Sequence, residues 1–394
     1  MIKRFLETFG PALFNRVRQT IPAIVLLVVP FVAAAATPTL TPPPPDVAAR
    51  GYILLDHQSG RVIAEQKADE RMEPASLTKI MAAYIVFNEL TSGKIRGDDE
   101  VLISEKAWRM AGSRTFVEVD TKVPVETLLK GMIVQSGNDA TVALAEHVAG
   151  AEEVFATLMN QTAKTLGLNS THYVNSTGLP DPDHYTTARD MALLAQALIR
   201  DFPDYYEWYG IREFTYNGIT QYNRNKLLWR DDSVDGVKTG HTEAAGYCLV
   251  SSARQDDMRL IAVILGAGSE NARARESQKL LSYGFRFFET HRLYAPMEQL
   301  TTVKVWKGVS DELALGLSED LYVTIPRGQY DRLNAAMKIQ PAITAPVDKG
   351  TKLGTVEITL SDTTIAQAPL VAMTDVSEAG FFRRLMDDVW LMFE

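Results

Sequence analysis

The chain has a single cysteine, Cys248, among its 394 residues. An intrachain disulfide is therefore excluded, and the folded state must depend on its hydrophobic core. The six histidines show none of the spacings that hold zinc, such as His-Glu-x-x-His, so neither a metal nor any other cofactor is expected. Lysine and arginine form no clusters and the formal net charge is −9, which argues against nucleic acid as a partner.

The N-terminal segment differs clearly in composition from the rest of the chain. Basic residues precede an apolar run at residues 21–32, and four alanines follow at residues 33–36. This order is typical of a secretory signal peptide, and we expect residues 1–36 to be cleaved from an exported protein. An uncleaved N-terminal anchor is the alternative. Residues 37–49 begin with a proline-rich stretch, which predicts a tether without packed structure.

Apolar patterns predict the elements that follow the tether. Strands are expected at residues 51–56, 61–66, 247–253 and 258–265, and helices at residues 125–134, 140–149, 151–165 and 190–199. Residues 98–121 show weak periodicity and are predicted to be mostly loop. Asp190 is expected to cap the helix that it begins, and His184 is given a structural role. Cys248 lies in a strand pattern and is interpreted as a packing residue.

The first motif with chemical content is Ser76-Leu77-Thr78-Lys79, at the head of an apolar run that predicts a buried helix starting just after Pro74. Positions i and i+3 share one face of a helix, so the amine of Lys79 would lie over the hydroxyl of Ser76. Burial and the helix dipole disfavour an ammonium ion there. A neutral Lys79 could then take a proton from Ser76 and make it a nucleophile. A helix-capping serine followed by an ordinary lysine is the alternative.

Two further motifs combine polar side chains with defined backbone settings. Ser136-Gly137-Asn138 lies on a tight loop between two predicted helices, where a packed scaffold would position it rigidly. A plain turn capped by Asn138 or Asp139 is the alternative there. Lys238-Thr239-Gly240 lies on a predicted antiparallel strand, and its glycine allows a ligand to approach the backbone. Arg224 offers a guanidinium group for a carboxylate, or else is a surface arginine.

In this order the three motifs resemble those of serine penicillin-binding proteins and β-lactamases. The Ser-Gly-Asn form is similar to that of low-molecular-mass D-alanyl-D-alanine carboxypeptidases, of peptidase S11 type, and so are residues 185–190, 223–225, 237–242 and 283–290. The resemblance covers essentially the whole chain after the signal peptide. It implies an α+β fold, with a penicillin-binding/β-lactamase-like catalytic domain at residues 50–295, in which helices flank an antiparallel sheet.

The resemblance also implies a mechanism of serine acyl transfer. Ser76 would attack the carbonyl between two D-alanines at the end of a peptidoglycan pentapeptide stem, and Lys79 would accept its proton. The backbone N–H groups of Ser76 and His241 would form the oxyanion hole. Ser136 would relay a proton to the leaving amine, supported electrostatically by Lys238.

Substrate binding is implied for the remaining motif residues. Asn138 would orient the substrate amide, and Gly240 and His241 would line the cleft. Thr239 and Arg224 would hold the terminal carboxylate, although some relatives carry a further arginine in a region that reads Gly266-Ala267-Gly268 here. β-Lactams would acylate Ser76 by the same route. A β-lactamase and a catalytically weak protein that binds the cell wall and influences cell shape are the alternatives.

The C-terminal part has a different pattern of apolar and polar residues. Short alternating runs from residue 296 to 376 predict a small β-sandwich without visible chemistry. Residues 377–394 form an amphipathic helix with an aromatic-rich stripe that is too short to span a bilayer. We expect it to lie in the interface on the periplasmic side of the inner membrane, which the resemblance also implies. A packed or oligomerising helix is the alternative, and the oligomeric state stays open.

Overall fold

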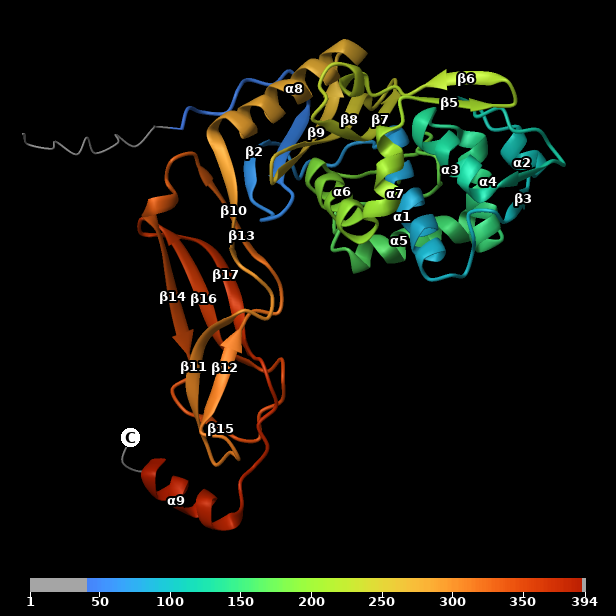
Figure 1. Cartoon of the computed structure of the whole chain (residues 1–394). Coiled ribbons are helices and arrows are strands. Elements are labelled where there is room, and N and C mark those ends of the chain that lie inside the picture. The colour runs from blue at the N-terminus through green and yellow to red at the C-terminus, as the bar shows by residue number, and fades with distance from the viewer. Residues whose placement is uncertain (1–40, 392–394) are drawn as a thin grey trace, which may run out of the picture. The chain divides into compact units, whose positions relative to one another are not determined.

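The computed structural model describes residues 41–391 of the chain. The predicted signal peptide, the start of the tether and the last three residues lie outside the described residues. The first sheet has five strands in the order β2-β1-β9-β8-β7, all antiparallel (Figure 1). Its strands are β1 (Gly51–Asp56), β2 (Val62–Gln66), β7 (Val234–Thr242), β8 (Gly246–Gln255) and β9 (Met258–Ala267).

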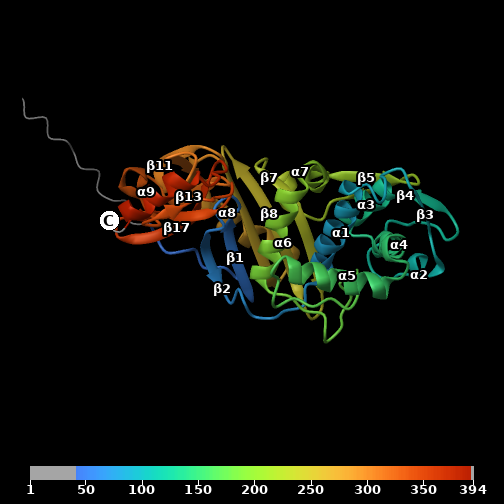
Figure 2. The same ribbon diagram turned by 90° about the horizontal axis from the view of Figure 1, so that it is seen from below.

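Both faces of this sheet are covered, because its central strands are apolar on both sides. In β1, Ile53 and Leu55 belong to the core beneath helices α1 (Lys79–Thr91) and α6 (Ala188–Asp201). The alternate residue Leu54 belongs to a second core beneath helix α8 (Glu270–Phe287). In Figure 1 α8 lies above the strands and α6 below them, and Figure 2 shows α6 in front of the sheet. Cys248 is fully buried in β8, as the strand pattern predicted.

The remaining elements of this part are β3 (Glu100–Leu102), α2 (Glu105–Trp108), β4 (Lys122–Pro124), α3 (Val125–Val134), α4 (Asn138–Ala149), α5 (Glu152–Thr165), α7 (Pro203–Tyr206), β5 (Glu213–Tyr216) and β6 (Ile219–Tyr222). Among them, the helices α3, α4 and α5 pack against α1 and help to bury it on nearly all sides. Three short 3₁₀ helices, η1 (Ala75–Thr78), η2 (Glu207–Gly210) and η3 (Lys226–Trp229), complete it. The predicted loop at residues 98–121 is interrupted by β3 and α2.

Helices α6 and α4 both begin two residues earlier than predicted. Helix α6 begins at Ala188 and is capped by Thr187, whose side chain accepts a hydrogen bond from the backbone N–H of Asp190. The capping oxygen therefore comes from a residue three positions earlier than predicted. The Asp190 carboxylate instead accepts hydrogen bonds from Ser170 and Thr171. Helix α4 begins at Asn138 rather than Ala140, so Asn138 projects from the first turn.

The C-terminal part is rich in strands. A six-stranded sheet has the order β14-β16-β17-β12-β11-β15, and β10 (Phe288–Tyr294) pairs with β13 (Leu321–Pro326). The sheet comprises β11 (Gln299–Trp306), β12 (Glu312–Gly316), β14 (Leu333–Ile339), β15 (Ile343–Thr344), β16 (Lys352–Leu360) and β17 (Thr363–Ala372), and η4 covers Tyr330–Arg332. Helix α9 (Phe381–Leu391) ends the described chain. The predicted α+β class, with a β-rich C-terminal part and a terminal helix, is confirmed. Among residues 41–391, no helix is both long and apolar enough to cross a bilayer.

Candidate active site

Ser76 lies in a tight turn at the head of α1. Its segment begins as the 3₁₀ helix η1, and the α-helix starts only at Lys79. A regular α-helix directly after Pro74 was predicted, so this detail is corrected. The tighter 3₁₀ turn places residues i and i+3 almost in line, which brings Lys79 under Ser76. Ala75, immediately before the serine, has a φ of +48°, an uncommon conformation for alanine.

The amine of Lys79 is surrounded by three oxygen atoms. Its Nζ lies 3.1 Å from Ser76 Oγ and 2.7 Å from both Asn138 Oδ1 and the carbonyl oxygen of Thr177. The last two oxygens can only accept hydrogen bonds. A neutral amine has two N–H groups, which would satisfy both acceptors and leave its lone pair for the hydroxyl of Ser76. The geometry therefore suits proton transfer from serine to lysine.

The side chain of Lys79 is buried, and its pKa is lowered as a result. Burial, followed by the positive charge of Arg224, lowers the pKa of Lys79 from 10.5 to about 7. Burial disfavours the ammonium because the charged form loses its hydration. The carboxylates of Asp139 and Glu152 oppose the shift. A substantial fraction of the amine is therefore neutral near neutral pH.

The Ser136 motif contacts the same amine through Asn138. Ser136 has a φ of +68° and its Oγ, which is buried, has no hydrogen-bond partner among residues 41–391. Asn138 donates from Nδ2 to the carbonyl of Ala111, which leaves its Oδ1 to accept from Lys79. The backbone N–H of Asn138 donates to the carbonyl of Ser113. These bonds connect the motif to the loop at residues 111–117.

The carbonyl of Thr177 owes its position to a close backbone contact. Gly178 has a φ of +82°, and a Cβ placed on it would lie 1.8 Å from the carbonyl oxygen of Ala75. The hydroxyl of Thr78 contacts Nε2 of His184 at 2.8 Å and donates to the same Ala75 carbonyl. Burial lowers the pKa of His184 to about 4, so its ring is neutral. The structural role predicted for His184 agrees with this setting.

Strand β7 passes beside the head of α1. A Cβ on Gly240 would lie 2.9 Å from the carbonyl oxygen of Pro74 and 3.3 Å from the backbone nitrogen of Leu77, so only glycine allows this approach. Lys238 is 3% exposed. Burial, and then the charge of Lys79, holds the pKa of Lys238 well below its ordinary value.

A cavity of about 260 Å³ joins these motifs. It is lined by Ser76, Ser113, Ser136, Arg224, Thr239, Gly240, His241, Tyr247, Glu270 and Arg273. The ring of His241 lies 4.0 Å from that of Tyr247. The structure thus brings together all nine site residues that the sequence singled out, with Lys79, Asn138 and Lys238 behind the cavity wall. Among residues 41–391, no group of three His, Cys, Asp or Glu side chains could hold a metal ion.

Sequence reasoning missed two charged residues in this cavity. Arg273 of α8 is nearly buried and donates to the carbonyl of Gly240 at 3.1 Å. It is a second arginine in the cavity beside Arg224, whereas residues 266–268 contain none. Glu270, one turn earlier, lies 3.4 Å from Arg273. The available signal was the i,i+3 spacing of an acidic and a basic residue just after the last strand of the sheet, where α8 begins, although no helix was predicted there.

Comparison with known proteins identifies the family. Residues 38–269 match the D-alanyl-D-alanine carboxypeptidase family, and residues 288–378 match the C-terminal domain of penicillin-binding protein 5. The chain belongs to the D-alanyl-D-alanine carboxypeptidase family. The predicted resemblance is therefore confirmed, and the protein is a serine-type D-Ala-D-Ala carboxypeptidase.

Members of this family match nearly the full length of the chain. The D-alanyl-D-alanine carboxypeptidases DacC and DacA of Escherichia coli (strain K12) are 48% and 44% identical over 355 residues, or 88% of this chain and 89% and 88% of theirs. Penicillin-binding protein 5 from Haemophilus influenzae has a similar structure, with a TM-score of 0.83 and 41% identity over 86% of this chain and 100% of that one. Penicillin-binding protein D2 from Listeria monocytogenes, solved in an ampicillin-bound form, matches 62% of this chain and 100% of its own at a TM-score of 0.57 and 29% identity.

Proposed function

We propose that this carboxypeptidase removes the terminal D-alanine from peptidoglycan pentapeptide stems through an acyl-enzyme on Ser76. The observation that carries this proposal is the set of three oxygen atoms around Nζ of Lys79, namely Ser76 Oγ and two oxygens that can only accept hydrogen bonds. The lowered pKa of Lys79 supports the same role. A general base is most effective when its pKa lies near the working pH.

Acylation begins with attack of Ser76 Oγ on the carbonyl carbon between the two D-alanines. The serine proton moves to Nζ of Lys79 as the bond to carbon forms. The backbone N–H groups of Ser76 and His241 stabilise the resulting oxyanion. These two groups can reach the same oxygen because β7, which carries His241, passes beside the head of α1. Ser136 relays the proton held by Lys79 to the leaving amine of D-alanine, so that both residues return to their starting protonation states, and Lys238 supports this transfer electrostatically. A water molecule then hydrolyses the ester and leaves a tetrapeptide stem.

The substrate is held by groups at the rim of the cavity. Asn138 orients the substrate amide. Thr239, Arg224 and Arg273 bind the terminal carboxylate, since hydrogen bonds from guanidinium groups to a carboxylate are among the strongest in proteins. Burial lowers the pKa of both arginines. An arginine side chain nevertheless keeps its charge in proteins at neutral pH. Penicillin carries a carboxylate next to its reactive carbonyl and acylates Ser76 by the same route.

The function is tested with a fluorescent penicillin and a pentapeptide substrate. The wild type is expected to be labelled and to release D-alanine, detected by mass spectrometry, while Ser76→Ala does neither. A wild type that is neither labelled nor active would rule out the proposed function. Rapid turnover of benzylpenicillin would instead support the β-lactamase alternative.

We also propose that the exported protein is attached to the periplasmic side of the inner membrane by α9. The polar face of this helix contacts the C-terminal sheet through Lys307, whose backbone N–H donates to Asp387 and whose amine pairs with Asp388. The opposite stripe stays exposed; it consists of Phe381, Phe382, Leu385, Met386, Val389 and Trp390. An exposed apolar stripe of this size favours insertion into a lipid interface over intramolecular packing.

The attachment is tested by sedimentation with phospholipid vesicles. Deletion of residues 377–394 is expected to leave active protein in the supernatant. The point variants Phe382→Glu and Trp390→Glu are expected to do the same, whereas Val309→Glu, at an exposed valine outside α9, is the matched control. Equal sedimentation of all variants would contradict the proposal. As domain boundaries, we propose residues 50–295 for the catalytic domain and 296–376 for the β-rich domain.

A further inference from the structure

Glu270 places a negative charge inside a cavity that otherwise suits a carboxylate ligand. Its carboxylate lies 2.8 Å from Nζ of Lys226 and 3.4 Å from Nη2 of Arg273. Arg273 is nearly buried, whereas Glu270 and Lys226 are each about 40% exposed. The carboxylate of Glu270 therefore contacts two cations, Arg273 inside the cavity and Lys226 at its edge.

The backbone fixes this arrangement. Ser269 caps α8 by accepting a hydrogen bond from Ala272, so Glu270 and Arg273 are separated by one helical turn on the same side. Lys226 begins η3, which is capped by Asn225. Asn225 also donates to the carbonyl of Gly236 in β7, so the edge cation is tied to the sheet that carries the Lys238 motif.

The charges of the three residues are set by their contacts. The hydrogen bond with Lys226 lowers the pKa of Glu270, so the glutamate is ionised at neutral pH. Its negative charge raises the pKa of Arg224, against the effect of burial. Glu270 thus acts electrostatically on both arginines to which a substrate carboxylate would bind. An ion so close to a ligand of the same sign opposes its binding.

We propose that Glu270 competes with the terminal carboxylate of the substrate for Arg273. The ion pair with Lys226 weakens the pairing of Glu270 with Arg273, so that Arg273 can bind the ligand. This inference rests on the proposed function, in which Arg224 and Arg273 receive that carboxylate. Glu270 sets how tightly carboxylate-bearing ligands bind, and Lys226 acts through Glu270. Both are positioning residues rather than catalytic ones.

The two residues are therefore predicted to have opposite effects on substrate affinity. Glu270→Gln removes the competing charge, so KM for a peptide ending in D-Ala-D-Ala should fall about 5-fold, equivalent to about 1 kcal/mol. Lys226→Gln frees Glu270 to pair fully with Arg273, so KM should rise by a similar factor. The effects are expected in KM more than in kcat, because binding rather than chemistry is changed. The double variant should behave like Glu270→Gln.

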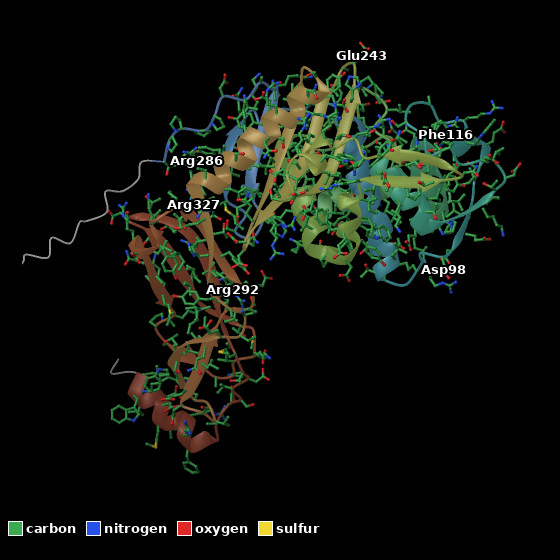
Figure 3. The ribbon with its side chains drawn as sticks, turned by 45° about the horizontal axis from the view of Figure 1, so that its top comes forward. Asp98, Phe116, Glu243, Arg286, Arg292 and Arg327 are labelled. Atoms are coloured by element: carbon green, nitrogen blue, oxygen red, sulfur yellow. The ribbon has the colours of Figure 1, made fainter. Side chains whose placement is uncertain are left out.

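The experiment compares these variants on two substrates. One is an N-acylated tripeptide ending in D-Ala-D-Ala, and the other is the same peptide with its terminal carboxylate replaced by a carboxamide. The affinity changes should appear for the first substrate and be absent for the second, which has no charge to repel. Competitive inhibition by acetate should also become stronger in Glu270→Gln. Glu243→Gln removes an equal charge from the exposed turn between β7 and β8 and serves as the matched control (Figure 3).

The outcomes separate this inference from the proposed function. Melting temperature and the yield of fluorescent-penicillin labelling show whether each variant is folded and can be acylated. If both single variants raise KM, or if the changes are the same for the carboxamide, the inference is wrong although the enzyme remains a carboxypeptidase. If the wild type releases no D-alanine, the proposed function itself has failed.

Discussion

Oδ1 of Asn138 and Nζ of Lys79 are joined by a buried hydrogen bond of 2.7 Å, so two motifs that are far apart in the chain meet at the amine that we propose as the proton acceptor. The bond fixes the position of this amine beside Ser76. It also couples the head of α1 to the first turn of α4. Loss of either residue is therefore expected to disturb catalysis more than folding.

Lys79→Met should abolish most acylation while the protein still folds. Methionine fills the same space but cannot accept the serine proton, and removal of a general base typically costs about 10²- to 10⁴-fold in rate. The rate of labelling by fluorescent penicillin measures this loss, and circular dichroism monitors the fold. A variant that is labelled at the wild-type rate would contradict the role of Lys79.

Acylation should increase with pH through neutrality. The neutral amine of Lys79 is the active form, and its pKa is lowered to about 7. Below that pH the acylation rate is expected to rise about tenfold per pH unit, and it should level off above it. The measurement is the second-order rate of acylation between pH 5 and 9, a range chosen about two units either side of that pKa. A rate that falls with pH across neutrality would exclude a neutral lysine base.

Gly178→Ala should destabilise the protein and prevent acylation. Its φ of +82° disfavours alanine, and the new Cβ would overlap the carbonyl of Ala75 next to the nucleophile. Gly167→Ala is the matched control, because Gly167 has a similar φ of +76° but open space around it. Urea denaturation should show a loss of about 1 kcal/mol for the control and about 3 kcal/mol or more for Gly178→Ala. Equal losses would mean that the close contact is unimportant.

Asp139→Asn should loosen the loop beside the cavity. The fully buried carboxylate of Asp139 accepts hydrogen bonds from the backbone N–H groups of Thr115, Phe116 and Val117. An amide turns an NH₂ group toward one of these donors, at a cost of about 1.5–3 kcal/mol. Amide hydrogen exchange at these three residues should become faster. Asp120→Asn, at an exposed position of the same loop, should leave that exchange unchanged.

Much of the site could be predicted from the sequence, because local spacing determines it. Ser76 and Lys79 meet since they lie three residues apart at a helix start, and Thr239 and Gly240 lie on a strand whose pattern is plain. The loop character of Ser136 follows from the glycine beside it. The tertiary structure changed only local details here, namely the 3₁₀ turn before Lys79 and the earlier start of α4.

Arg273 and Glu270 could not be predicted in this way. Arg273 and Glu270 enter the cavity because α8 packs against β8 and β9, which brings its first turn next to β7. The carbonyl of Thr177 reaches Lys79 because Gly178 permits a backbone contact that no side-chain pattern announces. The sequence by itself was enough to predict Ser76 as the nucleophile, Lys79 as the base and the family of reaction, since these depend on short-range spacing. Only the packing of distant segments decided which charges surround the substrate, because those contacts join residues that are remote in the chain.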